Sequence, residues 1–258
     1  MRNPPSLVVV AGGWIGPDWT TATVFPSTLT HPPLNGVTMF PGNDQLVACP
    51  HCARPAKHST LLSGNTIGVR IWTDGKQLAP MSPETPPIAM CLGCEKPFWV
   101  SLAKKLGQLD LDTGEDGIMD INPEWMDAEH VEEPTGEEYH HAIHSGFAKT
   151  VDEERTIRIL AWWRENDPHR DDAPTVSLQT ATGNRRKNLE ALLHLLGETN
   201  LGEQMMRAEI LRHLGEFDQS RTLLSKMENS PFAPVIRQLR ILCDARDVSV
   251  RELFLVAD

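Results

Sequence analysis

Two pairs of cysteines constrain this chain more than any other feature of its sequence. Cys49 and Cys52 form the first pair, Cys91 and Cys94 form the second, and 38 residues separate the pairs. Two intervening residues allow both thiolates of a pair to face one cation, and two such pairs supply the four soft ligands of a tetrahedral zinc site. The separation exceeds the usual spacing, but a longer loop adds little to the entropy cost of closing the site. We therefore expect these four cysteines to bind one structural Zn²⁺ ion.

Other uses of the cysteines stay open at this point. A thioredoxin-like redox motif needs one CxxC at the start of a helix, whereas this chain has two pairs with strand-like flanks. Two structural disulfides would suit an oxidising compartment, and an iron–sulfur cluster usually has tighter spacings. His51 and His58 lie near the first pair. Because four thiolates already complete a structural site, we expect both histidines to have surface roles.

Strand patterns surround both cysteine pairs. Residues 47–48 lead into the first pair, and residues 67–72 alternate between apolar and small or polar side chains, which is the period of a strand. Residues 73–76 (TDGK) predict a hairpin turn, and residues 97–100 predict a strand after the second pair. Residues 46–102 as a whole resemble a zinc ribbon, in which each CxxC pair lies at the tip of a β-hairpin. The resemblance implies a zinc-stabilised β unit and leaves its function open, because zinc ribbons serve nucleic-acid binding, protein docking and structure alike.

The acidity of the chain is concentrated in one segment. The net charge is -11, and residues 110–138 alone contain twelve Asp or Glu and no Lys or Arg. Dense like charge, together with the Gly and Pro residues of this segment, opposes compaction. We therefore predict an acidic linker, in which Trp125 and Met126 are apolar points that dock on a neighbour.

From about residue 137 the apolar residues recur with the period of helices. Thr150 and Glu153 fit a capping box, and Pro168 predicts the end of the helix that starts there, because the residue before a proline disfavours helix. The apolar tail at residues 253–256 is expected to pack on the helices. The predicted helices span residues 137–148, 151–167, 184–196, 201–214, 217–227 and 232–245.

One stretch of this helical region resembles a tetratricopeptide repeat over residues 202–233. A small residue at Ala208 allows close approach of two helices, Gly215 makes the turn, and Phe217 packs between the helices. The positions that carry the resemblance are Ala208, Gly215, Phe217, Leu224 and Pro231. The resemblance implies stacked helical hairpins and also protein binding, which is the usual function of this family. The combined layout is similar to that of uncharacterised bacterial proteins that join a zinc ribbon to tetratricopeptide-like helices.

Two further groups of residues invite a functional interpretation. His140, His141 and His144 have helical spacing that can hold a metal, but they lack the HExxH order of a zinc hydrolase, so we expect a solvated helix start. The adjacent Trp162 and Trp163 point about 100° apart on a helix, so one is expected in the core while the other, beside arginines, could form a stacking platform. No catalytic constellation is evident, and we do not expect an enzyme.

The N-terminal residues 1–38 differ from the rest of the chain. They contain six Pro and six Thr, and their only formal charges are Arg2 and Asp18. A short apolar run at residues 7–11 is broken by glycines and lacks a clean cleavage site, so a signal peptide is not favoured. We expect an extension, and Met39 is an alternative natural start.

The sequence therefore predicts an α+β protein, with a small β zinc ribbon followed by an all-α array of helical hairpins. The expected divisions are an extension (1–38), the ribbon (39–109), the acidic linker (110–138) and the helical array (139–258). No apolar run approaches the roughly 18 residues of a membrane span, and reduced CxxC cysteines suit the cytoplasm.

We expect the chain to be an interaction module with a protein partner. The alternative is nucleic-acid binding by residues 49–109, which carry seven Lys or Arg against three Asp or Glu, regulated by the acidic linker. The zinc ligands are expected to be Cys49, Cys52, Cys91 and Cys94. The candidate interaction surface comprises Trp72, Trp99, Trp162, Arg164 and Arg170.

Overall fold

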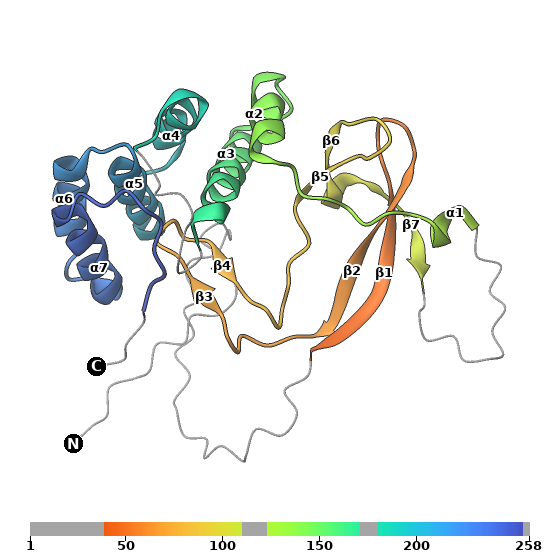
Figure 1. Ribbon diagram of the computed structural model, residues 1–258, viewed down its shortest axis with the longest axis horizontal. Helices are drawn as coiled ribbons and strands as arrows, with labels where there is room; N and C mark the ends of the chain where they lie inside the picture. The colour runs from red at the N-terminus through yellow and green to blue at the C-terminus, as the bar shows by residue number, and fades with distance from the viewer. Residues whose placement is uncertain (1–38, 110–122, 171–179, 255–258) are drawn as a thin grey trace, which may run out of the picture. The chain divides into compact units, whose positions relative to one another are not determined.

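The computed structural model describes residues 39–109, 123–170 and 180–254 (Figure 1). The predicted extension at residues 1–38 therefore lies outside the described residues. Small antiparallel sheets precede a series of helices, which confirms the α+β class. The described residues fall into two compact units, which we call the cysteine unit (39–68, 79–109 and 123–138) and the helical unit (69–78, 139–170 and 180–254).

Two β-hairpins build the cysteine unit. The strands β1 (Phe40–Ala48) and β2 (Pro55–Ser63) pair antiparallel, and β7 (Lys104–Leu109) joins the other side of β1, which gives the strand order β2-β1-β7. The short strands β5 (Ile88–Met90) and β6 (Pro97–Trp99) form the second hairpin, followed by the 3₁₀ turn η1 (Val100–Leu102). Each cysteine pair lies in the turn that connects the two strands of one hairpin.

The described part of the segment predicted as an acidic linker instead belongs to the cysteine unit. After the helix α1 (Pro123–Met126), residues 129–132 run beside both hairpins, with bridges from His130 to Lys57 and from Glu132 to Met90. Val131 packs against the core of this unit. The apolar contact of Val131 thus outweighs the acidic composition of residues 123–138. Residues 110–122 lie outside the described residues.

Trp125 makes the predicted apolar contact of this segment. Its ring lies against Gly107, where an added Cβ would come within 2.9 Å of it. It also packs against buried Leu46 and Leu109. Met126, the second predicted docking point, is 60% exposed, so of the two predicted points only Trp125 makes the contact.

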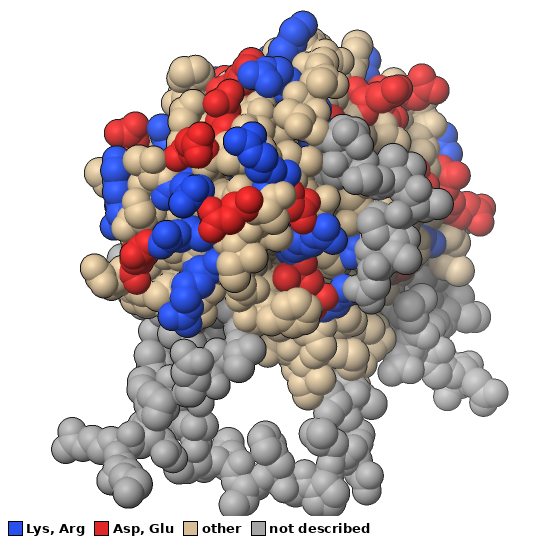
Figure 2. All heavy atoms as spheres, turned by 60° about the vertical axis from the view of Figure 1, so that its left-hand side comes forward, with Lys and Arg blue, Asp and Glu red and all other residues tan. Residues whose placement is uncertain are grey.

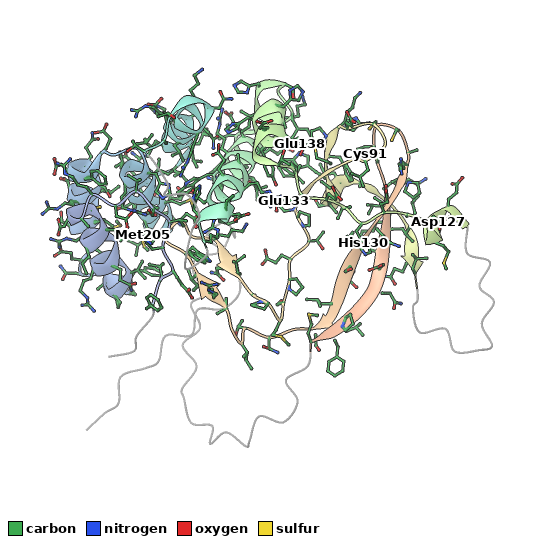
Figure 3. All side chains as sticks on the ribbon, in the orientation of Figure 1. Cys91, Asp127, His130, Glu133, Glu138 and Met205 are labelled. Carbon is green, nitrogen blue, oxygen red and sulfur yellow. The ribbon has the colours of Figure 1, made fainter. Side chains whose placement is uncertain are left out.

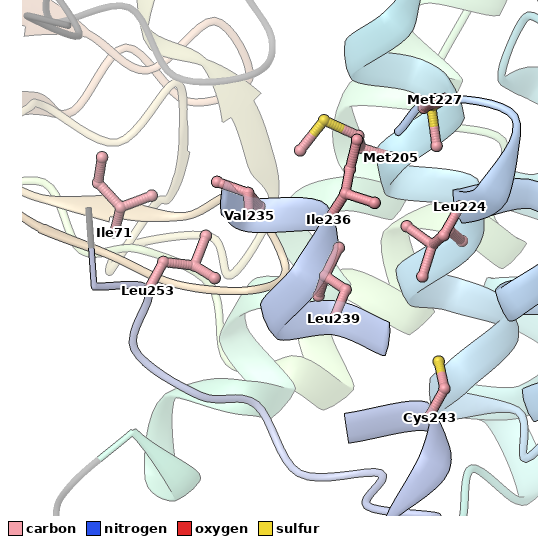
Figure 4. Packing of buried hydrophobic residues seen from close by; sticks show 10 residues of the cluster. Ile71, Met205, Leu224, Met227, Val235, Ile236, Leu239, Cys243 and Leu253 are labelled. Atoms are coloured by element: carbon pink, nitrogen blue, oxygen red, sulfur yellow. The ribbon is translucent and has the colours of Figure 1, made fainter. Parts of the chain in front are cut away.

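The hairpin predicted within the zinc ribbon belongs to the helical unit. The strands β3 (Arg70–Ile71) and β4 (Gln77–Leu78) flank the predicted turn, in which Gly75 has a φ of 83°. The backbone N–H of Leu253 donates to the carbonyl of Ile71 at 2.7 Å, and the two side chains share one apolar cluster (Figure 4). The hairpin belongs to the helical unit rather than to the predicted ribbon because Ile71 packs against apolar residues of the helices.

The helices confirm most of the predicted boundaries. Thr150 and Glu153 form the predicted capping box, and the helix that they start ends at Asn166, just before the Asp167–His169 3₁₀ turn that contains Pro168. No helix among the described residues is long and apolar enough to cross a bilayer. The helices are α2 (Gly136–His144), α3 (Val151–Asn166), α4 (Gly183–Leu195), α5 (Leu201–His213), α6 (Phe217–Ser225) and α7 (Ala233–Asp244).

Two apolar clusters form the core of the helical unit. The first joins α3, α4 and α5 around Trp162, Leu189 and Ile210. The second joins α5, α6 and α7 with the β3–β4 hairpin and the C-terminal tail. In this tail Leu253 is buried and Phe254 is exposed, while the last residues of the predicted apolar stretch lie outside the described part.

Candidate metal centre

The four cysteines of the two pairs come together in one cluster. Their sulfurs all lie within 4.8 Å of one another. Cys49 Sγ is 3.8 Å from Cys94 Sγ, and Cys52 Sγ is 3.6 Å from Cys91 Sγ. At a Zn–S distance of about 2.3 Å, the edge of a tetrahedron of sulfurs is about 3.8 Å. The donor set therefore fits a tetrahedral metal ion held by four thiolates.

The two cysteine turns have the same backbone conformation. The N–H of Cys49 donates to the carbonyl of Arg54 and the N–H of Ala53 to the carbonyl of Cys49, at 2.9 Å in both cases. In the second turn, Cys91 donates to Lys96 at 3.1 Å, and Glu95 to Cys91 at 2.7 Å. Each turn thus presents its two sulfurs on one side by the same arrangement of hydrogen bonds.

The residue after the second cysteine of each turn is left-handed. Ala53 has a φ of 62° and Glu95 a φ of 55°. This region favours glycine, because the Cβ of other residues approaches the following carbonyl oxygen at a cost of about 1–2 kcal/mol. The repetition of the same unfavourable conformation in both turns indicates that closing the cluster requires it.

Backbone N–H groups stabilise the negative charge of the cluster. The N–H of His51 lies 3.4 Å from Cys49 Sγ. Burial disfavours the Cys91 thiolate, but hydrogen bonds from the N–H groups of Gly93 and Cys94 and from the Cys49 and Cys52 thiols together lower the pKa of this thiol to about 7. Burial raises the pKa of the Cys49 thiol to about 12. A divalent ion bound by these sulfurs would replace the protons of the thiols.

Side chains of the first turn hold the two turns together. The Arg54 side chain lies against Gly93, where an added Cβ would be 2.7 Å from Arg54 Cδ. The guanidinium then donates to Glu129 at 2.9 Å. His51 Nε2 lies 3.1 Å from the carbonyl oxygen of Pro97. The first turn thus contacts the second turn and its following strand.

The cysteines differ in their exposure. Cys49 and Cys91 are 2% and 6% exposed and belong to the apolar core of the unit, Cys94 is half-buried, and Cys52 is exposed (Figure 3 labels Cys91). All four thiols are free, and each pair lies in a hairpin turn rather than at a helix start. The arrangement therefore favours the metal site over the thioredoxin-like and disulfide alternatives.

The five residues of the candidate interaction surface do not form one surface. Trp72 lies in the helical unit and is 3% exposed, with the guanidinium groups of Arg70 and Arg170 over its ring at 4.8 and 5.4 Å. Trp162 is fully buried. Arg170 is also buried, and its guanidinium binds Asp74. These three were wrongly placed on a surface, because each has apolar or ionic partners inside the helical unit.

The other two members lie in different units. Trp99 is half-buried in β6 of the cysteine unit, and Arg164 is partly exposed at the end of α3, 3.7 Å from Asp167. Trp163, the neighbour of buried Trp162, donates its Nε1–H to the carbonyl of Asp74 at 2.9 Å.

The histidines do not form a second metal cluster among the described residues, where the four cysteines make the only such group. His140 is buried, with Nε2 2.8 Å from Glu165 Oε1. The ring of His144 bonds the backbone carbonyl of His140 at 2.6 Å. His141 is exposed.

A grouping of Ser59, His130 and Asp44 lies beside β1 and β2 and was not expected (Figure 3 labels His130). Ser59 Oγ is 3.4 Å from His130 Nε2, and Asp44 Oδ2 is 3.3 Å from the same nitrogen. A nucleophilic triad needs the serine and the carboxylate on opposite ring nitrogens. Because both contact Nε2 and the His130 side chain is 55% exposed, the grouping lacks the geometry of an activated serine.

Sequence reasoning identified the four cysteines that cluster but missed the residues that support the cluster. Arg54, Gly93 and Glu129 act through contacts between distant segments, which no local pattern reveals. Ala53 and Glu95 could have been found, because each follows a CxxC pair at the position where the turn becomes left-handed. The chain matches no known protein family, no curated protein and no solved structure in the comparisons made.

Proposed function

We propose that the four cysteines bind one structural Zn²⁺ and that the cysteine unit is a zinc ribbon. The observation that carries this proposal is the pair of short cross-turn distances, 3.6 Å and 3.8 Å between sulfurs, which match the edge of a zinc tetrathiolate. Bound zinc would supply much of the folding free energy of this small unit. Reduced thiols also favour a cytoplasmic location.

The helical unit supports the second part of the proposal, that the chain is a protein-interaction module. The α5–α6 hairpin has the features expected of a tetratricopeptide-like pair: Ala208 and Leu224 are fully buried, and Gly215 is left-handed at the turn. Ser220 Oγ donates to the carbonyl of Ala208 at 2.7 Å, which reflects the close approach of the two helices. These contacts support stacked helical hairpins, a form that commonly binds other proteins.

A shallow groove on this hairpin is the candidate contact surface. It has a volume of about 400 Å³. Leu211 and Leu223 are its apolar members and Lys226 and Asp218 its charged members, so it suits a peptide with both apolar and polar side chains. The lining residues are Leu211, Asp218, Gln219, Thr222, Leu223 and Lys226.

Nucleic-acid binding by the cysteine unit has less support. Arg70 and Lys76 belong to the helical unit, where they pair with Glu252 and Asp167. The cysteine unit contains five Lys or Arg against ten Asp or Glu. Such a balance repels phosphate.

The helical unit also favours protein over nucleic acid as a partner. On the face that Figure 2 shows, Lys and Arg side chains are intermixed with Asp and Glu. Many of its arginines form ion pairs, such as Arg158 with Glu154 and Arg186 with Glu190. We propose a binding protein rather than an enzyme.

Affinity purification of the full chain tests the interaction. Thr222→Arg fills the groove, and Ser225→Arg adds the same charge on α6 outside the groove as a matched control. We expect a protein partner at stoichiometric amounts with the wild type and with Ser225→Arg, and a loss of at least about tenfold with Thr222→Arg. Equal recovery of the partner with both variants would contradict the assignment of the groove as the contact surface. Salt-sensitive recovery of nucleic acid would favour nucleic-acid binding instead.

A further inference from the structure

We propose that Cys52 is the reactive ligand of the metal centre, at which peroxides and soft electrophiles attack first and thereby release the metal. This inference rests on the proposed function, because it requires a metal held by the four thiolates. It concerns the reactivity of one ligand, which the binding of a structural ion does not itself require.

Exposure distinguishes Cys52 from the other ligands. Cys49 and Cys91 are 2% and 6% exposed and pack in the apolar core of the cysteine unit. Cys94 is half-buried, whereas Cys52 is exposed together with its neighbours His51 and Ala53. A metal-bound thiolate remains a nucleophile, and reagents in solution reach it only where the sulfur is accessible.

A backbone hydrogen bond adds to the protection of the Cys49 sulfur. Cys49 Sγ accepts the N–H of His51 at 3.4 Å. Such a bond withdraws electron density from sulfur and reduces its nucleophilicity. Burial and this hydrogen bond therefore act together on Cys49, whereas Cys91 is protected by burial and Cys94 by partial burial.

The first step with a peroxide is a substitution at oxygen. The Cys52 thiolate attacks one oxygen of hydrogen peroxide, a new S–O bond forms, the O–O bond breaks, and hydroxide leaves. Sulfur is thereby oxidised by two electrons to sulfenic acid, and peroxide is reduced. With an alkylating agent such as iodoacetamide, the thiolate forms an S–C bond and iodide leaves.

Cys91 is positioned to complete the reaction. Its sulfur is 3.6 Å from that of Cys52, closer than the 3.8 Å between Cys49 and Cys94. The Cys91 thiolate attacks the sulfur of the sulfenic acid, an S–S bond forms, and hydroxide leaves. Overall, two thiolates and one molecule of hydrogen peroxide give one disulfide and two hydroxide ions. The disulfide joins the two cysteine turns and removes two of the four ligands, so Zn²⁺ is released.

The test uses the full-length, zinc-loaded protein. Metal content is measured first, and the protein is then treated with a limiting amount of iodoacetamide, about 0.2 equivalents, or with hydrogen peroxide. Peptide mass spectrometry locates the modified cysteines, and a chromogenic chelator measures released zinc. Cys243, which is 2% exposed, serves as an internal control for buried thiols.

We expect Cys52 to be alkylated at least about tenfold more than Cys49, Cys91 or Cys94. We expect peroxide to give the Cys52–Cys91 disulfide with one zinc released for each disulfide. Cys52→Ser and Cys94→Ser each remove one ligand, and only Cys52→Ser should slow zinc release by peroxide. Metal-loaded protein that is labelled first elsewhere, or that forms disulfides within the CxxC pairs, would overturn this inference alone. Protein that holds no metal before treatment would overturn the proposed function and this inference with it.

Discussion

The guanidinium of Arg170 holds the carboxylate of Asp74 in two parallel hydrogen bonds of 2.6 and 3.0 Å. Asp74 is 0% and Arg170 4% exposed. Asn166 Nδ2 donates to the same carboxylate at 2.8 Å. The turn of the β3–β4 hairpin is therefore held by buried charge against the end of α3, within the helical unit.

Removal of one partner of this pair should be costly. Arg170→Ala leaves the Asp74 carboxylate buried without its main partner, and we expect the free energy of unfolding to fall by about 3–5 kcal/mol. Arg170→Lys should rescue little, because an ammonium group cannot replace both hydrogen bonds. Urea titration followed by circular dichroism measures the change. Arg186→Ala, which removes an exposed pair with Glu190, is the control and should cost under about 1 kcal/mol; equal effects would contradict the account.

His213 is a neutral, buried histidine in the same unit. Its Nδ1 accepts from Arg185 at 2.9 Å and from the indole of Trp162 at 3.3 Å, and its Nε2 donates to Glu209 at 3.2 Å. Burial lowers the pKa of His213 to about 4, reinforced by the charges of Arg212 and Arg185 and opposed by Glu209.

This histidine should make the stability of the helical unit depend on pH. Between pH 6.5 and 4 the unfolded chain binds a proton on His213 that the folded chain does not, so the free energy of unfolding falls as the pH decreases. At about 1.4 kcal/mol per pH unit, the loss is roughly 3 kcal/mol across this window. Urea titrations at several pH values measure it. We expect a shallower dependence for His213→Gln, and identical slopes for variant and wild type would contradict the prediction.

The left-handed residues of the cysteine turns offer a test of backbone conformation. Ala53→Val places a β-branched side chain at a φ of 62°, and we expect zinc affinity to fall about tenfold, because the strain is of order 1–2 kcal/mol. Ala53→Gly should bind zinc as tightly as the wild type or tighter. Competition with a chelator measures the affinity. Glu95→Val and Glu95→Gly should repeat this pattern, and a Val variant that binds normally at either position would refute the role of the turn.

The contact between the two turns predicts a coupling between Arg54 and Gly93. Gly93→Ala brings a Cβ into the space of Arg54 Cδ and should displace the guanidinium from Glu129. We expect a modest loss of up to about 1 kcal/mol, because the arginine is flexible and its side chain is 50% exposed. In the Arg54→Ala background the same substitution should cost less. Thermal unfolding of the four proteins in the double-mutant cycle measures the coupling, and additive effects would exclude it.

Local patterns predicted the parts of this fold that local forces decide. The capping box of Thr150 and Glu153 and the turn at Gly75 depend on neighbours in sequence, and both are present. The CxxC spacing identified four cysteines that cluster, because two intervening residues place both sulfurs of a pair on one side of a turn. The assignment of the hairpin failed, since Asp74 and Arg170 are 96 residues apart and no local pattern shows their contact.

The amino-acid composition gave a wrong prediction for the acidic segment, because a few apolar contacts decide the structure of its described part. The acidic content of residues 110–138 predicted a linker, whereas Trp125 and Val131 hold the described part of that segment in the cysteine unit. Ten of the 38 residues that separate the CxxC pairs, residues 69–78, belong to the helical unit.

X-ray absorption spectroscopy of the purified protein at the zinc edge tests the central claim most directly. The account predicts one zinc per chain with four sulfur neighbours at about 2.3 Å, and the loss of one sulfur in Cys91→Ser. A zinc ion with nitrogen or oxygen neighbours at about 2.0–2.1 Å in place of sulfur, or a reduced protein that binds no metal, would contradict it.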